Sequence, residues 1–314
     1  MAINFFSTPY DVSTTTTGTY VTTTVSTQVP ATSTAAIIRF VNKGGSAYRY
    51  SFRMKGSTDD FQTKQFLEAS TGGWAIVGLN SSRQFEQYIE NSAVDVYLWG
   101  YFEDEVVMFT NAVDVSTATT GSYVDVDISP YTGADTAVAA ICTSNTVNGG
   151  TDAQFYARKN GSTDDRYRAV NDTGHYFIVG LDSSQIFEQK IDNVVQDCYV
   201  LGYFRYGVTM ETNGVDVSRT GTGSYADLTN AGQGIAGVLY EAYETTTSSQ
   251  FGLRQNGSTH NTTSTNLTNA YVGTLQQGII ECDRNGIVEG KVAALTCDFY
   301  QMGTFPIKRR IMVT

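Results

Sequence analysis

The sequence predicts an all-β protein built from three tandem antiparallel β-sandwich domains. Three observations lead to this prediction: one unit recurs three times, apolar and polar residues alternate within it, and the composition favours strands. The chain has 314 residues, of which 43 are Thr, 30 are Gly and 20 are Tyr. Thr and Tyr suit a half-buried pleated surface, and Gly supplies the turns between short strands.

The repeat appears as short motifs that return at a nearly constant offset. Asp11-Val12-Ser13 returns at Asp114 and Asp216, at offsets of 103 and 102 residues. Each copy also holds an Arg three residues before a turn Gly, a Glu-containing strand, and a Tyr-x-x-Gly segment at 97–100, 199–202 and 300–303. Because internal repeats of this kind define the unit of the fold, we predict domains at 1–109, 110–211 and 212–314.

The second copy shows what each unit contains. In Ser122–Ile128 the apolar residues alternate with Asp125 and Asp127, which is typical of a strand with one wet face. Turn signals such as Asn160-Gly161 separate further strand-like runs, which are Thr136–Thr143, Gln154–Lys159, Arg166–Val170, His175–Leu181, Ile186–Ile191, Asp197–Arg205 and Val208–Thr212. About eight short strands per unit and no helical stripe favour a jelly-roll-like sandwich. An immunoglobulin-like sandwich is the alternative, and spacing does not choose between them.

A short apolar segment lies at each junction between units. Copies of it are found at 3–7, 106–110, 208–212 and 310–314, so three domains carry four of them. If each domain needs one, the first or the last is free to pair with another chain. The candidate assembly-strand residues are Ile3, Phe5, Phe6, Ile311, Met312 and Val313. The simpler interpretation is that the domains share these segments as stiff linkers and that the terminal copies close the end domains.

The net charge and the hydropathy argue against two classes of binding partner. With 20 basic and 31 acidic residues the net charge is −11, which argues against a phosphate-binding surface for nucleic acid. No apolar run approaches the roughly 18 to 20 residues that span a bilayer. The first residues lack the basic and apolar regions of a signal peptide. We therefore expect a soluble protein made in the cytoplasm.

Charged residues recur at equivalent positions of all three copies. They are Arg53, Glu86, Asp95, Arg158, Glu188, Asp197, Arg254, Glu289 and Asp298. A carboxylate pair in each domain is one arrangement for glycoside hydrolysis. An ion-paired network that holds strands in register is favoured instead, because catalysis seldom occurs in triplicate along one chain. We therefore predict a protein that is not an enzyme and needs no cofactor.

A pair of Asp residues follows the Gly-Ser-Thr turn in two copies, as Asp59, Asp60, Asp164 and Asp165. Their oxygens are the ligands that calcium prefers. The third copy has His260-Asn261 at this place, so a solvated turn is favoured and no metal is predicted. The four cysteines match no zinc-site spacing, and whether they form disulfides is left open.

The combination of Asp-Val-Ser, Arg-x-x-Gly-Ser-Thr-Asp-Asp, Phe-Glu-Gln and Tyr-x-x-Gly-Tyr-Phe resembles tandem β-sandwich modules of phage and prophage surface proteins. The resemblance implies a virion structural protein: a head decoration, a fibre or a receptor-binding protein. It implies self-association or binding to other virion proteins, as a homo-oligomer on the virion surface, and no catalytic residues.

Two alternatives to a virion protein are left open. One is a carbohydrate-binding adhesin that recognises cell-surface glycans, for which the Tyr content argues. The other is an extracellular filament subunit that assembles by strand exchange through its terminal segments.

Overall fold

A computed structural model describes residues 3–61, 66–146, 153–166, 168–170, 175–244, 249–258, 266–270 and 275–307. Almost all regular structure in these residues is strand, and the helix α1 (Ser129–Thr132) is a single turn. Six four-stranded antiparallel sheets are present, two from each third of the chain. Within the described residues no helix is long and apolar enough to cross a membrane.

The first sandwich pairs the sheet β1-β8-β3-β6 with the sheet β2-β7-β4-β5. Its strands are β1 (Asn4–Asp11), β2 (Val21–Thr24), β3 (Ala35–Asn42), β4 (Tyr48–Met54), β5 (Phe66–Leu67), β6 (Gly72–Gly78), β7 (Gln84–Ile89) and β8 (Val94–Phe102).

The second sandwich pairs β9-β16-β11-β14 with β10-β15-β12-β13. Its strands are β9 (Val106–Asp114), β10 (Val124–Asp127), β11 (Ala139–Thr146), β12 (Ala153–Lys159), β13 (Arg168–Val170), β14 (His175–Gly180), β15 (Ile186–Ile191) and β16 (Gln196–Phe204).

The third sandwich pairs β17-β24-β19-β22 with β18-β23-β20-β21. Its strands are β17 (Thr209–Asp216), β18 (Ala226–Asn230), β19 (Ile235–Glu244), β20 (Ser249–Gln255), β21 (Asn266–Ala270), β22 (Leu275–Glu281), β23 (Ile287–Val292) and β24 (Cys297–Pro306).

The strand order is that of a jelly roll. In each sandwich one sheet takes strands one, eight, three and six in that order, and the other takes two, seven, four and five. An immunoglobulin-like domain would join its first, second, fifth and fourth strands in one sheet. The jelly-roll prediction is therefore confirmed, and the strand order excludes the immunoglobulin-like alternative.

The junction segments belong to single sandwiches. β1, β9 and β17 each pair with the last strand of their own third of the chain: β8, β16 and β24. The boundaries expected near 109 and 211 fall inside β9 and β17, so strand pairing places the changeover a few residues earlier. The N-terminal copy, with Phe5 opposite Gly100, closes the first sandwich. The copy at 310–314, with Ile311, Met312 and Val313, lies outside the described residues.

The repeated Gly of the Tyr-x-x-Gly motif has a steric explanation. In each last strand the pairing slips by one residue just before this glycine, which forms a bulge. A Cβ built on Gly100 would lie 2.2 Å from the carbonyl oxygen of Asn4, and one on Gly202 would lie 2.3 Å from that of Val107. Only glycine allows the first and last strands to approach this closely.

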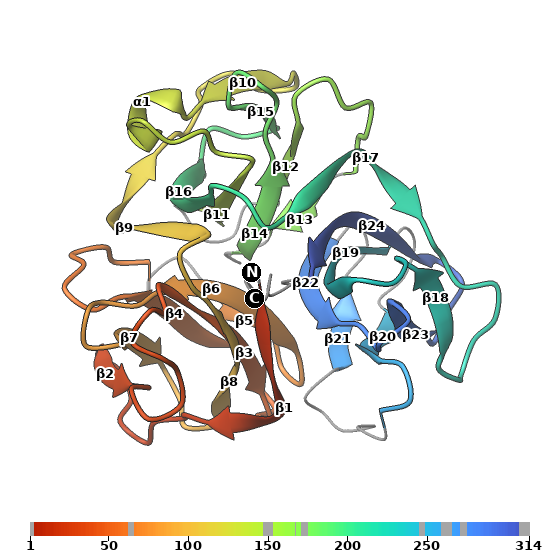
Figure 1. The fold of residues 1–314 in the computed structure, drawn as a ribbon, viewed down its shortest axis with the longest axis horizontal. Helices are drawn as coiled ribbons and strands as arrows, with labels where there is room; N and C mark the ends of the chain where they lie inside the picture. The colour runs from red at the N-terminus through yellow and green to blue at the C-terminus, as the bar shows by residue number, and fades with distance from the viewer. Residues whose placement is uncertain are drawn as a thin grey trace, which may run out of the picture.

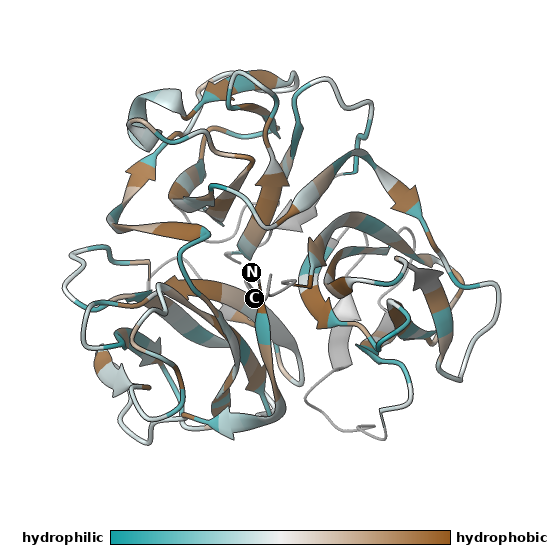
Figure 2. Cartoon of the chain, viewed as in Figure 1, coloured by the Kyte–Doolittle hydropathy of each residue, from teal (hydrophilic) through white to brown (hydrophobic). Residues whose placement is uncertain are grey.

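The three sandwiches surround a common centre (Figure 1). The edge strands β6, β14 and β22, which are equivalent in the repeat, contact one another there. We call the line through this centre the pseudo-threefold axis. The view down the shortest dimension of the molecule shows the three lobes around one centre, so the chain is a three-lobed block and not an extended rod. Apolar residues concentrate on strands inside each lobe and toward the centre, and the outer loops are largely polar (Figure 2).

Candidate functional site: the contacts between sandwiches

Three equivalent phenylalanines meet on the pseudo-threefold axis. Phe102, Phe204 and Phe305 lie at or next to the ends of the last strands of the three sandwiches and are fully buried. Their ring centroids lie 5.1 Å apart for Phe102 and Phe204, and 5.9 Å apart for the other two pairs. Aromatic pairs at such separations are attractive beyond the area that they bury. The Phe of the repeated Gly-Tyr-Phe motif is therefore the centre of the whole block.

Side chains from one sandwich also complete the strand edges of the next. The hydroxyl of Tyr176, on β14, accepts a hydrogen bond from the backbone N–H of Phe52 at 3.0 Å and donates one to its carbonyl oxygen at 3.1 Å. Phe52 lies on β4 of the first sandwich. A tyrosine of the second sandwich thus takes the place of a neighbouring strand, because it satisfies a backbone N–H and a C=O that would otherwise be buried unpaired.

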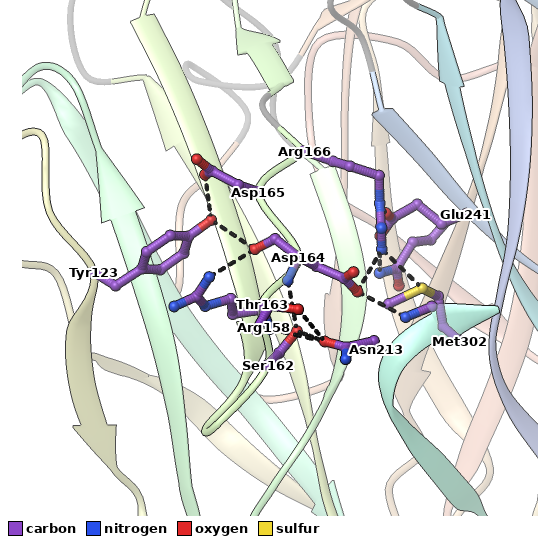
Figure 3. Close-up of polar contacts among 12 residues, drawn as sticks. Tyr123, Arg158, Ser162, Thr163, Asp164, Asp165, Arg166, Asn213, Glu241 and Met302 are labelled. Atoms are coloured by element: carbon purple, nitrogen blue, oxygen red, sulfur yellow. Dashed lines mark hydrogen bonds and ion pairs between the residues drawn. The ribbon is translucent and has the colours of Figure 1, made fainter. Parts of the chain in front are cut away.

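The Gly-Ser-Thr-Asp turns form a lock between consecutive sandwiches, shown for the second and third in Figure 3. Asn213, at the start of the third sandwich, accepts hydrogen bonds through Oδ1 from Ser162 Oγ and Thr163 N, each at 2.8 Å. Asp164 Oδ2 accepts one from the backbone N–H of Gly214 at 2.7 Å. The turn therefore grips the first strand of the following domain.

The same lock joins the first and second sandwiches. Asn111 Oδ1 accepts hydrogen bonds from Ser57 Oγ at 3.1 Å and Thr58 N at 2.8 Å. Asp59 Oδ2 accepts one from the N–H of Ala112 at 2.8 Å. At the third junction the residue that corresponds to Asn111 is Thr8, and the corresponding turn continues into residues outside the described part.

The Asp residues that were considered as calcium ligands interact with other groups of the protein. Asp59 and Asp164 accept the backbone hydrogen bonds described above. Asp165 accepts a hydrogen bond from the Tyr123 hydroxyl at 2.7 Å and lies 3.2 Å from Lys190 Nζ. Asp60 lies near Tyr20, whose pKa is raised mainly by burial and in part by the charge of this carboxylate. The expected solvated turn is thus an interdomain contact at Asp59 and Asp164, and no metal-binding cluster occurs among the described residues.

A buried ion pair reinforces the junction of the second and third sandwiches. Arg166 Nε lies 2.5 Å from Glu241 Oε1, and the two side chains are 9% and 1% exposed. The guanidinium also donates to Asp164 at 2.9 Å and stacks on Tyr300 at 4.1 Å from its ring centroid. Burial alone would lower the pKa of Arg166, but the attraction of Glu241 raises it. Burial raises the pKa of Glu241, and Arg166 opposes that shift.

The corresponding place in the first junction is apolar. Phe61 occupies the position of Arg166 in the repeat, and its ring lies 5.0 Å from that of Tyr199, the counterpart of Tyr300. Thr143 corresponds to Glu241, since each lies opposite the equivalent tyrosine in the strand register. One geometric position thus carries an aromatic contact at one junction and a buried ion pair at the next.

Within each sandwich the structure brings the predicted Arg and Glu together on neighbouring strands. Nε of Arg53, Arg158 and Arg254 lies 2.8, 2.8 and 2.6 Å from the carboxylate of Glu86, Glu188 and Glu289. A tyrosine ring covers each guanidinium: Tyr20, Tyr123 and Tyr225, at 3.7, 3.4 and 3.9 Å. Such stacking adds to the attraction of the charges.

The predicted Asp residues lie apart from these ion pairs. Asp95 pairs with Lys43 and accepts a hydrogen bond from the Tyr97 hydroxyl at 2.8 Å. Asp197 accepts the equivalent bond from Tyr199 at 2.9 Å. Partial burial raises the pKa of Asp298. The proposed network of Arg, Glu and Asp is therefore an Arg–Glu pair with a separate Asp in each domain.

The four cysteines are free thiols. Cys142, Cys198, Cys282 and Cys297 are all buried, and none forms a disulfide. Burial raises the pKa of Cys282 to about 12, so its thiol stays protonated and unreactive at neutral pH. The thiols are part of the packed interior.

The residues at the centre and the junctions had only weak sequence signals. The Phe of Gly-Tyr-Phe persists in the third copy although its Tyr has become Thr304. The Asn that precedes Asp-Val-Ser by three residues recurs in two copies, as Asn111 and Asn213. Both signals mark positions that contact another sandwich.

No protein-family model and no curated protein sequence matches the chain. The solved structures that are similar to it include the following two, both at low scores. One is described as "The Triple Jelly Roll Fold and Turret Assembly in an Archaeal Virus"; it is 11% identical, with a TM-score of 0.22, over 98% of this chain and 91% of that chain. The other contains the M60 catalytic domain with the CBM51-1 and CBM51-2 domains from Clostridium perfringens ZmpB; it is 6% identical, with a TM-score of 0.20, over 92% of this chain and 33% of that chain. The fold assignment rests on the strand order.

Proposed function

We propose that the chain is a non-enzymatic structural protein of a virion surface, and that it decorates a capsid as a preassembled three-lobed block. The observation that carries the proposal is the set of specific locks that hold three jelly rolls around one axis. A single chain with this shape presents the outline of a trimer, which suits the threefold or local threefold positions of a closed shell. A three-lobed block fits decoration better than a fibre.

The pairing of the repeated charges supports a structural role over catalysis. A hydrolase needs a carboxylate of raised pKa beside a second, accessible one. Glu86 instead receives Arg53 and Lys55, each at 2.8 Å, and these cations hold its pKa below the usual range although burial opposes them. Three of the 20 tyrosines, whose number argued for glycan binding, are engaged within the protein, since Tyr20, Tyr123 and Tyr225 cover the arginines.

The proposal is tested on virus particles. Mass spectrometry of purified particles should detect the chain in a fixed ratio to the major shell protein, and electron cryomicroscopy should show three-lobed density on their surface. Particles that lack the chain, together with specific binding of the pure protein on a glycan array, would instead support the adhesin alternative. Filaments formed by the pure protein alone would support the strand-exchange alternative.

A further inference from the structure

The outer rim of each lobe ends in a short edge strand. β2, β10 and β18 are the terminal strands of their sheets and lie at the periphery (Figure 1). Each pairs on one side only, with β7, β15 and β23, and no described strand pairs with the other side. An edge strand of this kind is a template for pairing with another chain unless charge or shape blocks it.

The backbone of β2 presents free groups outward. The Val25 N–H donates to the Arg83 carbonyl at 3.0 Å, which marks this pair as hydrogen-bonded. Hydrogen-bonded and non-bonded pairs alternate along an antiparallel ladder, so Thr23 and Val21 also point their backbone groups toward β7. Thr22 and Thr24 therefore direct their N–H and C=O groups away from the sheet, and both residues are exposed.

Charge distinguishes this edge from the other two. The sequence has no Asp, Glu, Lys or Arg from Val12 to Ile38. Thr22 and Thr24 correspond in the repeat to Asp125 and Asp127 on β10, and β18 carries Asp227. Inserted charges are a common protection of edge strands against pairing. The first sandwich thus has an unprotected edge, and its counterparts are protected.

We propose that β2 is a self-association site, at which β2 of a second copy of this chain pairs antiparallel across a twofold axis. A chain of net charge −11 repels its own copies, so contact is favoured where the approaching surfaces are neutral. The same segment on both copies satisfies a twofold interface, because the outward groups of Thr22 on one copy meet those of Thr24 on the other. In a shell this contact joins neighbouring blocks, so the inference adds a partner to the proposed function.

The decisive variant places the acidic residues of β10 at the equivalent positions of β2. Thr22→Asp with Thr24→Asp copies β10, where the cross-strand pair Asp125 and Glu188 is already tolerated. The variant should fold with an unchanged circular dichroism spectrum. It should weaken dimerisation at least about tenfold, measured by sedimentation equilibrium, because it sets four like charges across the dyad. Raising the salt concentration should strengthen the wild-type dimer by screening its net charge.

The reciprocal variant is the matched control. Asp125→Thr with Asp127→Thr removes the protection of β10 and should give each copy two pairing edges, so species larger than dimers should form. A wild-type chain that stays monomeric at millimolar concentration would overturn the proposal, as would a T22D/T24D variant that dimerises as well as the wild type. Either result leaves the virion role standing, because incorporation into particles is measured separately.

Discussion

The junction of the second and third sandwiches permits a sharp test, because the first junction supplies its own replacement. Arg166→Phe alone leaves the Glu241 carboxylate, which is 1% exposed, without its cation. Glu241→Thr alone removes the carboxylate that lies 2.5 Å from Arg166 Nε and leaves Asp164 to pair with the guanidinium. Breaking a buried pair on one side costs about 3 to 5 kcal/mol, because the remaining charge is desolvated and uncompensated.

The double variant Arg166→Phe with Glu241→Thr installs the residues of the first junction. Phe61 already packs there against Tyr199 at 5.0 Å, and Tyr300 offers the same ring to a phenylalanine at 166. We therefore expect the free energy of unfolding of the double variant to lie within about 2 kcal/mol of the wild-type value, since replacing a buried ion pair by apolar packing is often neutral. The coupling energy in the cycle is then at least about 3 kcal/mol.

The assay is urea denaturation followed by circular dichroism, with calorimetry to show whether the sandwiches unfold together. Additive effects, in which the double variant loses as much as both single variants combined, would refute the reasoning. The reciprocal exchange, Phe61→Arg with Thr143→Glu, tests whether the two junctions are interchangeable in both directions.

Three further predictions concern the axis and its surroundings. Burial raises the pKa of Glu105 to about 7 from a usual 4.5, so the folded state binds the proton more tightly than the unfolded state. The stability of the wild type therefore falls as pH rises from about 4.5 to about 7. Glu105→Gln removes this charge and should stabilise the protein by about 3 kcal/mol at pH 8. Urea titrations between pH 4 and 8 measure this slope, and an equal slope in the variant would contradict it. Phe204→Ala should cost about 3 to 5 kcal/mol in the same assay, and a loss below about 1 kcal/mol would show that the three rings do not hold the centre. Gly180→Ala should cost about 1 to 3 kcal/mol, because the new Cβ would lie 2.8 Å from Cβ of Met210. Met210→Ala keeps that Cβ and should not restore the loss, whereas Met210→Gly removes the contact, and a Gly180→Ala penalty of the same size in the Met210→Gly background would place the strain elsewhere.

Strands such as β8, β15 and β23 could be predicted from local pattern because their burial alternates from one residue to the next. The run Ile186–Ile191 coincides with β15, and the other expected strands of the second copy differ from the observed ones by a few residues at their ends. The choice of jelly roll over immunoglobulin-like sandwich depends on which strands pair at long range. Spacing along the chain is similar for both, so only the structure decides.

The pairing of the repeated charges could be predicted from the sequence, and the contacts of Phe61 and Arg166 at the junctions could not, for one physical reason. Arg53 and Glu86 form an ion pair that recurs in every sandwich, so the equivalent residues are identical in the three copies and are visible in the sequence. Phe61 and Arg166 occupy one geometric position and each lies against the equivalent tyrosine, but Arg166 also pairs with Glu241 where the first junction has Thr143. The recurring turns and phenylalanines are therefore visible in the repeat, whereas the junction positions at which the copies differ are not.

Covalent linkage of the three lobes changes how substitutions act on the block. In a trimer of identical subunits every mutation appears three times, so a change that improves one interface is imposed on all of them. Here each junction belongs to its own stretch of chain, and one could acquire Arg166 and Glu241 while another kept Phe61 and Thr143. The three lobes have similar shapes but different residues. A partner that binds one particular lobe therefore holds the whole block in a single orientation.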